Sequence, residues 1–231
     1  MIKITKKRKD ILSIIDHNKT YDVKSAVELI YKIKKVNFNA SIDLHLRLNV
    51  DIKKSINNIR GSISIPHGNG KKNKILALCD ENEIDLCLKS GADYAGLEDY
   101  IFKIENKWFD FDNIVISSKN FSKISKLGPL LGPKGLMPTI KSGNITDDLQ
   151  KEIMKIKKGK IYLKMDKGGI IHITIGKTNF SIDQICENTI YSIKQISSMF
   201  SNYIKKNDFY KSIFLVSTMG ASVKIDSKNI L

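Results

Sequence analysis

The sequence predicts an α/β protein of two domains: a two-layer domain built from both ends of the chain, and a three-layer domain inserted between them. Two patterns lead to this prediction. Apolar and polar residues alternate in the extended segments near both ends, whereas the extended segments of the middle are continuously apolar and lie between helical segments. We place the terminal domain at residues 1–67 and 159–231, and the insert at residues 68–158.

The first part of the chain carries two helical patterns and two alternating runs. Apolar residues recur at helical spacing over residues 11–15 and 23–33, which predicts two helices. Residues 41–48 alternate strictly, which predicts a half-exposed strand whose outer face is polar and partly basic. A shorter alternating run over 59–65 stops at Pro66 and the glycines that follow it.

The middle of the chain has a different pattern. Two continuous apolar runs, at 74–79 and 113–117, predict buried strands, and a short extended piece is expected at 93–97. Helical patterns separate and follow these runs, at 81–91, 98–104, 119–127 and 147–157. Strands without alternation between helices are typical of a parallel sheet covered on both faces, so the insert is expected to be a small doubly wound domain.

Alternation returns after Gly159. The runs at 161–165 and 170–176 are joined by a turn, and together they predict an antiparallel hairpin. A long amphipathic helix is expected over 182–203. Two closing strands follow, at 212–217 and 223–226, on either side of a turn that contains Gly220. Helices and alternating strands on both sides of the insert therefore indicate one discontinuous domain.

The charge of the chain is concentrated in the predicted terminal domain. Residues 1–67 carry fourteen Lys and Arg against six Asp and Glu, and residues 159–231 carry ten against five. The insert holds fifteen against thirteen. The abundance of Lys, 36 residues against three Arg, together with 38 Ile, is typical of an A- and T-rich coding sequence, which raises the total charge. The asymmetry remains, and it indicates that the terminal domain binds a polyanion, most simply a nucleic acid.

Composition limits the environment of the protein. The chain is 42% hydrophobic and 27% charged, which is typical of a soluble globular protein. Its three cysteines form no CxxC motif, which favours a reducing compartment and disfavours a disulfide framework or a zinc site. The basic N-terminal segment has no long apolar run, so neither a signal peptide nor a membrane span is predicted. We expect a cytoplasmic protein without a membrane partner.

Signals of catalysis are weak. Gly68 and Gly70 precede a predicted strand, whereas the glycines of a dinucleotide-binding turn follow one, and the segment 128–135 lacks the spacing of a phosphate-binding loop. The four histidines are scattered, and no nucleophile lies in an evident pair with a base. We therefore predict no enzymatic activity and no cofactor. The alternative, an α/β enzyme that binds a nucleotide in the insert, is disfavoured because no glycine-rich turn follows the first strand of the insert.

The segment GPLLGPKGLMP at 128–138 is far more specific. Its three glycines and three prolines predict a rigid, irregular loop. This loop, with RGSISIPHGNGK, GADYAG, WFDFD, DKGGIIHITIGK and the closing STMG, follows the order and spacing of motifs in the ribosomal protein L-one family. The chain resembles this family from about residue 5 to residue 226.

The resemblance implies a basic RNA-binding domain made from both chain ends, an inserted Rossmann-like domain and no enzymatic activity. It implies that the terminal domain binds large-subunit ribosomal RNA (rRNA) and builds the mobile stalk beside the tRNA exit site. The partners implied are this rRNA segment, the leader of the protein's own mRNA, whose binding represses translation, and, indirectly or transiently, the exit-site tRNA. The free protein is expected to be a monomer.

The resemblance also implies which residues contact RNA. RNA is recognised mostly through its shape, sugars and phosphates, which calls for hydroxyls, small residues and a partly apolar platform. Ser217, Thr218, Met219 and Gly220 supply these: we expect the Thr218 hydroxyl to bond a ribose, Met219 to cover a base or sugar, and Gly220 to let the backbone approach. Further matching positions are Glu28, Phe38, Ser41, His45, His172 and Lys177. From the residues alone, Phe38 would be a core ring and Glu28 solvated surface.

Overall fold

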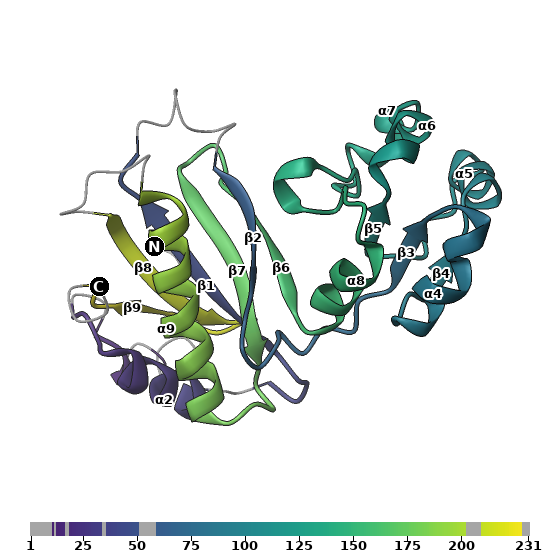
Figure 1. The fold of residues 1–231 in the computed structure, drawn as a ribbon. Coiled ribbons are helices and arrows are strands. Elements are labelled where there is room, and N and C mark those ends of the chain that lie inside the picture. The colour runs from purple at the N-terminus through teal and green to yellow at the C-terminus, as the bar shows by residue number, and fades with distance from the viewer. Residues whose placement is uncertain are drawn as a thin grey trace. The chain divides into compact units, whose positions relative to one another are not determined.

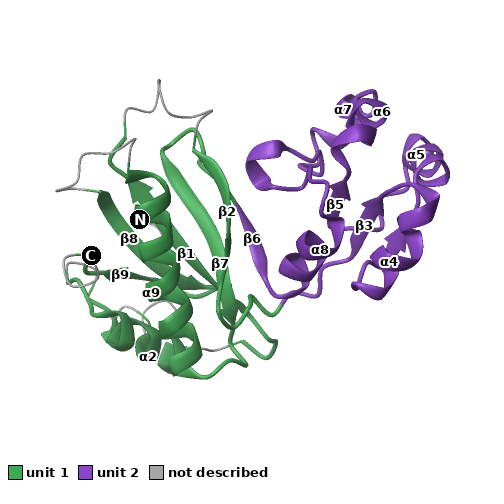
Figure 2. Cartoon of the chain, in the orientation of Figure 1, with its two compact units in different colours: residues 1–70, 163–231 green, residues 71–162 purple. Residues whose placement is uncertain are grey.

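The computed structural model describes residues 11, 13–16, 19–33, 36–50, 59–201 and 209–227. The chain forms two compact units: a terminal unit of residues 1–70 and 163–231, and an insert of residues 71–162 (Figure 2). By sequence, the terminal unit carries 23 Lys and Arg against 11 Asp and Glu, and the insert 16 against 13. The α/β fold class predicted from the sequence is confirmed.

The terminal unit is built on a four-stranded antiparallel sheet in the order β7-β1-β8-β9 (Figure 1). The strands are β1 (Ser41–Leu48), β7 (Ile170–Lys177), β8 (Tyr210–Ser217) and β9 (Ser222–Ile225). In β1, Ile42, Leu44 and Leu46 are fully buried, while the residues between them are partly or fully exposed. One face of the sheet is therefore the core face, and the other, which we call the outer face, is polar.

Two helices cover the core face: α2 (Val23–Ile33) and α9 (Ile182–Met199). The buried residues of α2 follow helical spacing, as the sequence predicts: Val23, Ala26, Val27, Ile30 and Ile33. Helix α9 ends at Met199, earlier than the predicted limit of Tyr203, which lies outside the described residues. The predicted first helix also extends into residues outside the described part of the chain.

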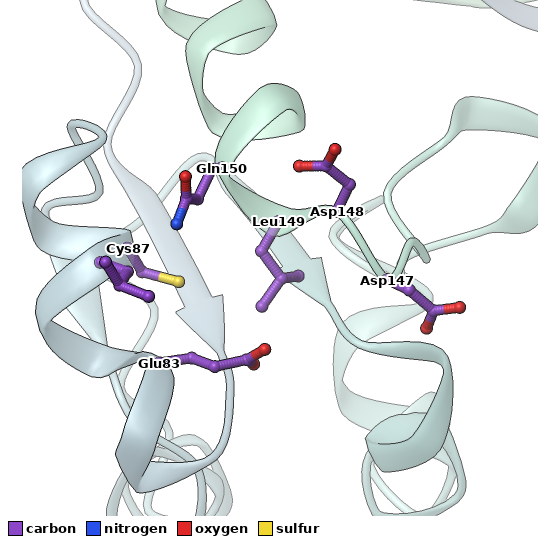
Figure 3. Close-up of a pocket in the computed structure, with 7 residues that line it drawn as sticks. Glu83, Cys87, Asp147, Asp148, Leu149 and Gln150 are labelled. Atoms are coloured by element: carbon purple, nitrogen blue, oxygen red, sulfur yellow. The ribbon is translucent and has the colours of Figure 1, made fainter.

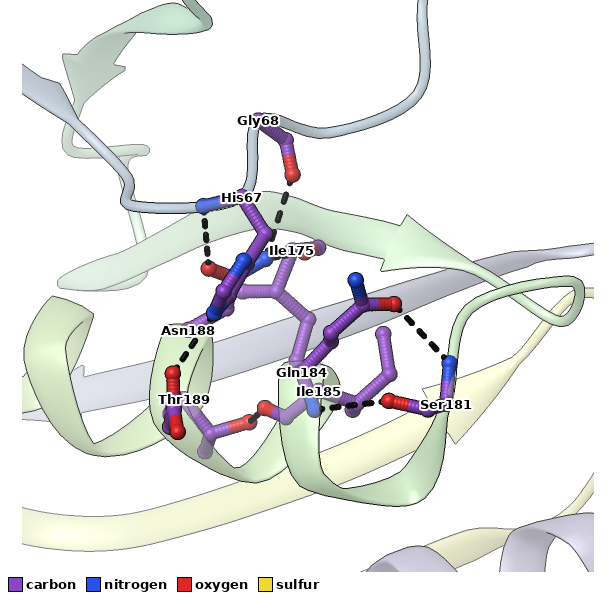
Figure 4. A network of polar contacts seen from close by, with 9 residues as sticks. His67, Gly68, Ile175, Ser181, Gln184, Ile185, Asn188 and Thr189 are labelled. Atoms are coloured by element: carbon purple, nitrogen blue, oxygen red, sulfur yellow. Dashed lines mark hydrogen bonds and ion pairs between the residues drawn. The ribbon is translucent and has the colours of Figure 1, made fainter.

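Polar contacts on α9 anchor the segment that leads toward the insert (Figure 4). The side-chain amide of Asn188, fully buried, donates to the carbonyl oxygens of Gly68 and Ile175 at 3.1 and 2.8 Å, and its oxygen accepts the His67 N–H at 3.1 Å. Ser181 and Gln184 form a capping box at the start of the helix. One buried side chain therefore joins α9, β7 and the start of the HGNG segment at 67–70.

A second, two-stranded sheet pairs β2 (Arg60–Ser64) with β6 (Lys160–Lys164). The chain leaves β6 through Met165, which bridges to Ile171, and turns at Asp166–Gly169 into β7. The Asp166 carboxylate stabilises this turn: its Oδ1 accepts N–H bonds from Gly168 and Ile170 at 2.8 and 2.7 Å. The hairpin predicted after Gly159 is therefore formed only at this turn and bridge, because β6 pairs with β2 and β7 with β1.

The insert contains a parallel sheet in the order β4-β3-β5, made of β3 (Ile75–Leu78), β4 (Tyr94–Ala95) and β5 (Asn113–Ile116). Both faces are buried: Ile75 and Ala77 belong to one apolar core, and Leu76 and Leu78 to another. The first core includes α4 (Ile84–Lys89) and α8 (Leu149–Lys157). The second includes α5 (Glu98–Glu105) and α6 (Phe121–Ser125). Short 3-10 turns lie at Glu81–Glu83, Ser118–Asn120 and Ile140–Ser142.

The predicted irregular loop at 128–138 begins with a helical turn, so the prediction was wrong for its first residues. Residues Gly128–Leu131 form α7, in which Pro129 lies in the first turn. Proline is tolerated there because the N–H groups of the first turn have no helical acceptor. Leu131 is fully buried in the second core of the insert, and the irregular backbone starts at Gly132.

Candidate nucleic-acid interface

Segments distant in sequence meet at one end of the terminal unit's sheet. β1 begins beside the end of β8, because the strand register pairs Ile42 with Ser217. β7 ends on the other side of β1, where Lys177 is paired with Ser41, and β9 begins directly after the turn that follows β8 (Figure 1). Antiparallel pairing therefore gathers the predicted residues Ser41, Lys177 and Ser217 at this end.

Thr218 fastens this end of the sheet. Its N–H donates to the carbonyl oxygen of Ser41 at 2.9 Å. Its hydroxyl oxygen accepts the Ser41 N–H at 3.2 Å, and the hydroxyl lies 3.3 Å from the Ser41 carbonyl, to which it donates. The hydroxyl that we expected to bond a ribose is thus engaged within the protein. Its position favours a role in holding the two strands in register, with one lone pair left for a ligand.

The turn Ser217–Gly220 exposes an apolar side chain. The Gly220 N–H closes the turn on the Ser217 carbonyl oxygen at 2.7 Å. Met219 has a φ of 62°, which is uncommon for a residue other than glycine, and its side chain is 77% exposed. A Cβ on Gly220 would lie 2.2 Å from the Ser217 hydroxyl oxygen, so only glycine fits there without a shift. The turn therefore presents the thioether to solvent from a tightly fixed backbone.

Phe38 lies just before β1 and is 52% exposed, so its ring is not part of the core. The backbone after it is fixed by Thr178, which follows β7: Ala40 and Thr178 exchange hydrogen bonds of 2.8 and 3.1 Å. Because only two residues lie between Phe38 and Ser41, Phe38 lies at the same end of the sheet as the Ser217–Gly220 turn. We call this group the strand-end surface: Phe38, Ser41, Lys177, Ser217, Thr218, Met219 and Gly220.

His45 and His172 lie farther along the outer face, on paired positions of β1 and β7. Their Nδ1 atoms are 2.8 Å apart, and the rings meet edge to face with centroids 4.9 Å apart. Burial, and then the electrostatic effect of the neighbouring His172 ring, lower the pKa of His45. Asp166 Oδ2 lies 3.4 Å from His172 Nε2, and hydrogen bonds, led by the one from the Ile170 N–H, hold the pKa of this carboxylate below its usual value.

Glu28 is the predicted site residue that the structure leaves apart. It lies half-buried on α2, and the hydrogen bonds that join the strand-end surface do not include it. Its charge acts instead near α9, on Cys186. The pKa of the Cys186 thiol is raised mainly by burial, and the nearby charges of Asp183 and Glu28 raise it further.

Three further residues of the outer face were missed in the sequence. Phe214 of β8 is paired with His45, Lys224 of β9 is paired with Phe214, and Thr174 donates to the Asp43 carboxylate at 2.7 Å. The signal was present for Phe214, because it alternates with the buried Ile213 and Leu215. Which strands are neighbours, and hence which side chains meet, is not visible in that alternation.

The insert does not suit a nucleotide. In doubly wound domains a nucleotide binds beyond the carboxyl ends of the strands. There, Asn120 donates to Asp80 at 2.8 Å, and the acidic segment Asp80–Glu83 stands in place of a glycine-rich turn. A cavity of about 470 Å³ between α4 and α8 is lined by three carboxylates, Glu83, Asp147 and Asp148, with Leu86, Cys87, Leu149 and Gln150 (Figure 3). These carboxylates would repel phosphate groups.

Together these features define a class: a basic α/β protein whose terminal unit exposes a hydroxyl-rich and apolar surface, with an insert that lacks a nucleotide site. The chain matches the model of the Ribosomal protein L1p/L10e family over residues 29–221. It belongs to this family, and the resemblance recognised in the sequence is confirmed. Family members are structural ribosomal proteins, so the chain is not an enzyme.

Curated relatives match over the full chain. Large ribosomal subunit protein uL1 of Bacteroides thetaiotaomicron is 42% identical over 230 residues, which cover 100% of this chain and 99% of the relative. The protein of the same name from Porphyromonas gingivalis has the same identity and coverage. That from Christiangramia forsetii is 40% identical over 228 residues, 99% of this chain and 98% of the relative. Among the described residues, none of the helices combines the length and the hydropathy of a membrane span.

Proposed function

We propose that this protein is a structural constituent of the large ribosomal subunit and binds large-subunit rRNA through the strand-end surface. The observation that carries the proposal is the exposure of Met219 and Phe38 at one end of the sheet, beside backbone fixed by Thr218 and Thr178. Two apolar side chains on rigid backbone offer faces for bases and sugars without a large loss of conformational entropy on binding.

The charge of the terminal unit supports the same partner. Its excess of Lys and Arg over Asp and Glu, twelve by sequence, exceeds that of the insert, which is three. Such an excess favours association with phosphates, while hydroxyls, small residues and apolar faces determine where the RNA fits. Relatives named as large ribosomal subunit proteins support the choice of ribosomal RNA among polyanions.

In this proposal the RNA-bound protein builds the mobile stalk near the tRNA exit site, where it touches the departing tRNA transiently. The same surface binds a similar structure in the leader of the protein's own mRNA and represses its translation. The protein is a monomer when free. It is ribosome-associated in the cytoplasm, and the residues expected to contact rRNA remain Glu28, Phe38, Ser41, His45, His172, Lys177 and Ser217–Gly220.

The first experiment measures the affinity of the purified protein for large-subunit rRNA as salt is raised. Each neutralised phosphate contributes a slope of roughly −0.7 to −0.9 to the plot of log K against log salt. We expect a steep slope together with a large effect of Met219→Ala, about tenfold or more in Kd. Lys194→Ala, a change on the exposed side of α9, is the control, with an expected effect of about twofold. Equal losses from both variants would mean nonspecific binding by a polycation.

A second experiment separates a ribosomal role from action on RNA elsewhere in the cell. Tagged protein is followed through a sucrose gradient of a cell extract. Co-sedimentation with large subunits, lost in Met219→Ala, is expected. A protein that stays at the top of the gradient would favour an RNA chaperone or a repressor that acts off the ribosome. A reporter fused to the protein's own mRNA leader tests repression directly.

A further inference from the structure

The histidine pair on the outer face of the terminal unit has a defined proton arrangement. The two Nδ1 atoms are 2.8 Å apart, so one of them must carry a proton and the other must accept it. The second nitrogen of His172, Nε2, lies 3.4 Å from the Asp166 carboxylate. Since a carboxylate can only accept, this nitrogen is protonated, and in neutral His172 the Nδ1 atom is the acceptor.

The tautomer of His45 follows from that of His172. His45 must donate its Nδ1–H to His172, which leaves its Nε2 without a proton while the ring is neutral. Within the described part of the chain, no hydrogen bond or ion pair engages this Nε2 atom. Asp166 is itself held by the Gly168 and Ile170 N–H groups. The turn before β7 therefore sets the donor-to-acceptor direction of the hydrogen bonds from Asp166 through His172 to His45.

Charges of both signs lie on the elements around the pair. They are Asp43 and Arg47 on β1, Lys177 at the end of β7, Lys224 on β9, Asp166 and Lys167 in the turn, and Lys164 at the end of β6. Asp43 accepts from Thr174, and Asp166 is occupied by the turn and His172. Five of these groups are cations and two are carboxylates, so they attract an anion to this face. An anion beside the unprotonated Nε2 of His45 favours its protonation.

We propose that His45 is a proton-coupled phosphate contact: as RNA binds, Nε2 of His45 takes up one proton from solvent and keeps it, and the new N–H donates a hydrogen bond to a phosphodiester oxygen, while His172 and Asp166 set the ring's tautomer. This rests on the proposed function and adds a contact on the outer face to the strand-end surface. His45 is the contacting residue, and His172 and Asp166 are positioning residues. A second proton on the pair would put two N–H groups against each other, so the pair takes one proton only.

The test measures the affinity of the full chain for large-subunit rRNA between pH 5.5 and 8.0 at constant ionic strength. A group whose pKa is higher in the complex than in the free protein strengthens binding below its free pKa, and the gain is lost as pH rises through its bound pKa. We expect the wild type to gain about fivefold in affinity between pH 8 and pH 6 relative to His45→Asn, for one exposed ionic contact.

His67→Asn is the matched control, because His67 also faces a carboxylate, Glu187 at 2.6 Å, but lies away from the outer face. The pH profile of this variant should follow that of the wild type.

Nuclear magnetic resonance of the imidazole nitrogens reports the tautomers of His45 and His172 directly, and a purely structural role of His172 and Asp166 would not require these tautomers. In the free protein at pH 7.5 we expect the Nδ1–H tautomer for His45 and the Nε2–H tautomer for His172, and Asp166→Asn should disturb both. An Nε2–H tautomer of His45, or parallel affinity profiles of wild type and His45→Asn, would overturn this site alone. Absence of rRNA binding at every pH would overturn the proposed function and the site together.

Discussion

Gly220 shows how one residue type at one position determines the shape of the candidate interface. Its N–H bonds the Ser217 carbonyl oxygen, and the Ser217 hydroxyl occupies the space that a Cβ would need. The neighbouring Met219 is held at positive φ by the same turn. Adding one methyl group at position 220 would therefore change both the backbone of the turn and the position of the exposed Met219 side chain, although it removes no contact with a ligand.

We expect Gly220→Ala to lower the free energy of unfolding of the terminal unit by about 1–3 kcal/mol, the usual effect of overpacking. RNA affinity should fall as well, because the turn must shift. Urea unfolding followed by circular dichroism and a binding assay check both. Gly128→Ala is the control, since a Cβ there meets no heavy atom within 4 Å and the expected change is within about 0.5 kcal/mol. Equal stability of the two variants would contradict the geometry of the turn.

His45 gives the terminal unit a stability that depends on pH. Its pKa in the folded protein is below the ordinary value of 6.5, so the unfolded chain binds the proton first. The contribution of His45 to stability is then fully present above about pH 6.5 and is lost as the pH decreases from 6.5 through the lower pKa of the folded protein. Urea unfolding at pH 7.5 and 5.5 should show a smaller loss for His45→Asn than for the wild type. A larger loss in the variant would mean that the folded protein stabilises the charged ring.

At the scale of elements, one ion pair joins α8, the turn before it and β6. Lys160 Nζ donates to Glu152 Oε1 and to the Ser142 carbonyl oxygen, the latter at 2.7 Å, and both charged side chains are only 7% exposed. A buried charge depends on its partner, because leaving one ion without the other carries the full desolvation penalty. We therefore infer that the Lys160–Glu152 pair mainly determines how these three elements pack, and that its net contribution to stability is small.

Lys160→Met alone should destabilise the insert by about 3–5 kcal/mol, because Glu152 loses its buried partner and keeps only the exposed Lys155, whose Nζ lies 3.9 Å from Oε2. The double variant Lys160→Met, Glu152→Leu should regain most of that loss. Trp108 is the sole tryptophan of the chain and packs against Tyr94, Tyr100 and Phe111 of the insert, so its fluorescence in urea reports this unit. A double variant as unstable as the single one would show that packing, and not charge, sets the loss.

Regular patterns made most elements predictable, and long-range pairing limited the rest. The alternation of residues 41–48 follows from one strand face lying on the core, and it predicted β1 without knowledge of its partners. The internal hydrogen bond of the Thr218 hydroxyl was not predictable, because it depends on Ser41, which is distant in sequence. The facing imidazoles of His45 and His172 likewise depend on strand register. Contact of these residues with RNA stays a prediction.

At the scale of the whole molecule, each unit has its own core and its own charge balance. The sheet of the terminal unit joins strands from both ends of the chain, so cutting the chain between them separates β1 from β7 and β8. The insert is a continuous segment with cores on both faces of its sheet. We therefore propose that residues 1–67 and 159–231 act as the RNA-binding domain and that residues 68–158 are dispensable for affinity.

Replacement of residues 68–158 by a short glycine–serine linker should leave the terminal unit folded and rRNA affinity within about threefold of the full chain, a smaller change than that expected of Met219→Ala. Circular dichroism checks the folding, and the isolated insert serves as the comparison, with no measurable affinity expected at the same salt concentration. Tight binding by the insert alone would reverse the assignment of the two units.

Contact between the strand-end surface and rRNA is measured most directly by photo-crosslinking in cells, with a photoreactive amino acid placed at Met219, and at Lys194 as the control. Both side chains are exposed, but only Met219 belongs to the strand-end surface. We expect cross-links from position 219 to large-subunit rRNA within assembled subunits, and few from position 194. Cross-links of equal yield from both positions, or none to rRNA from position 219, would contradict it.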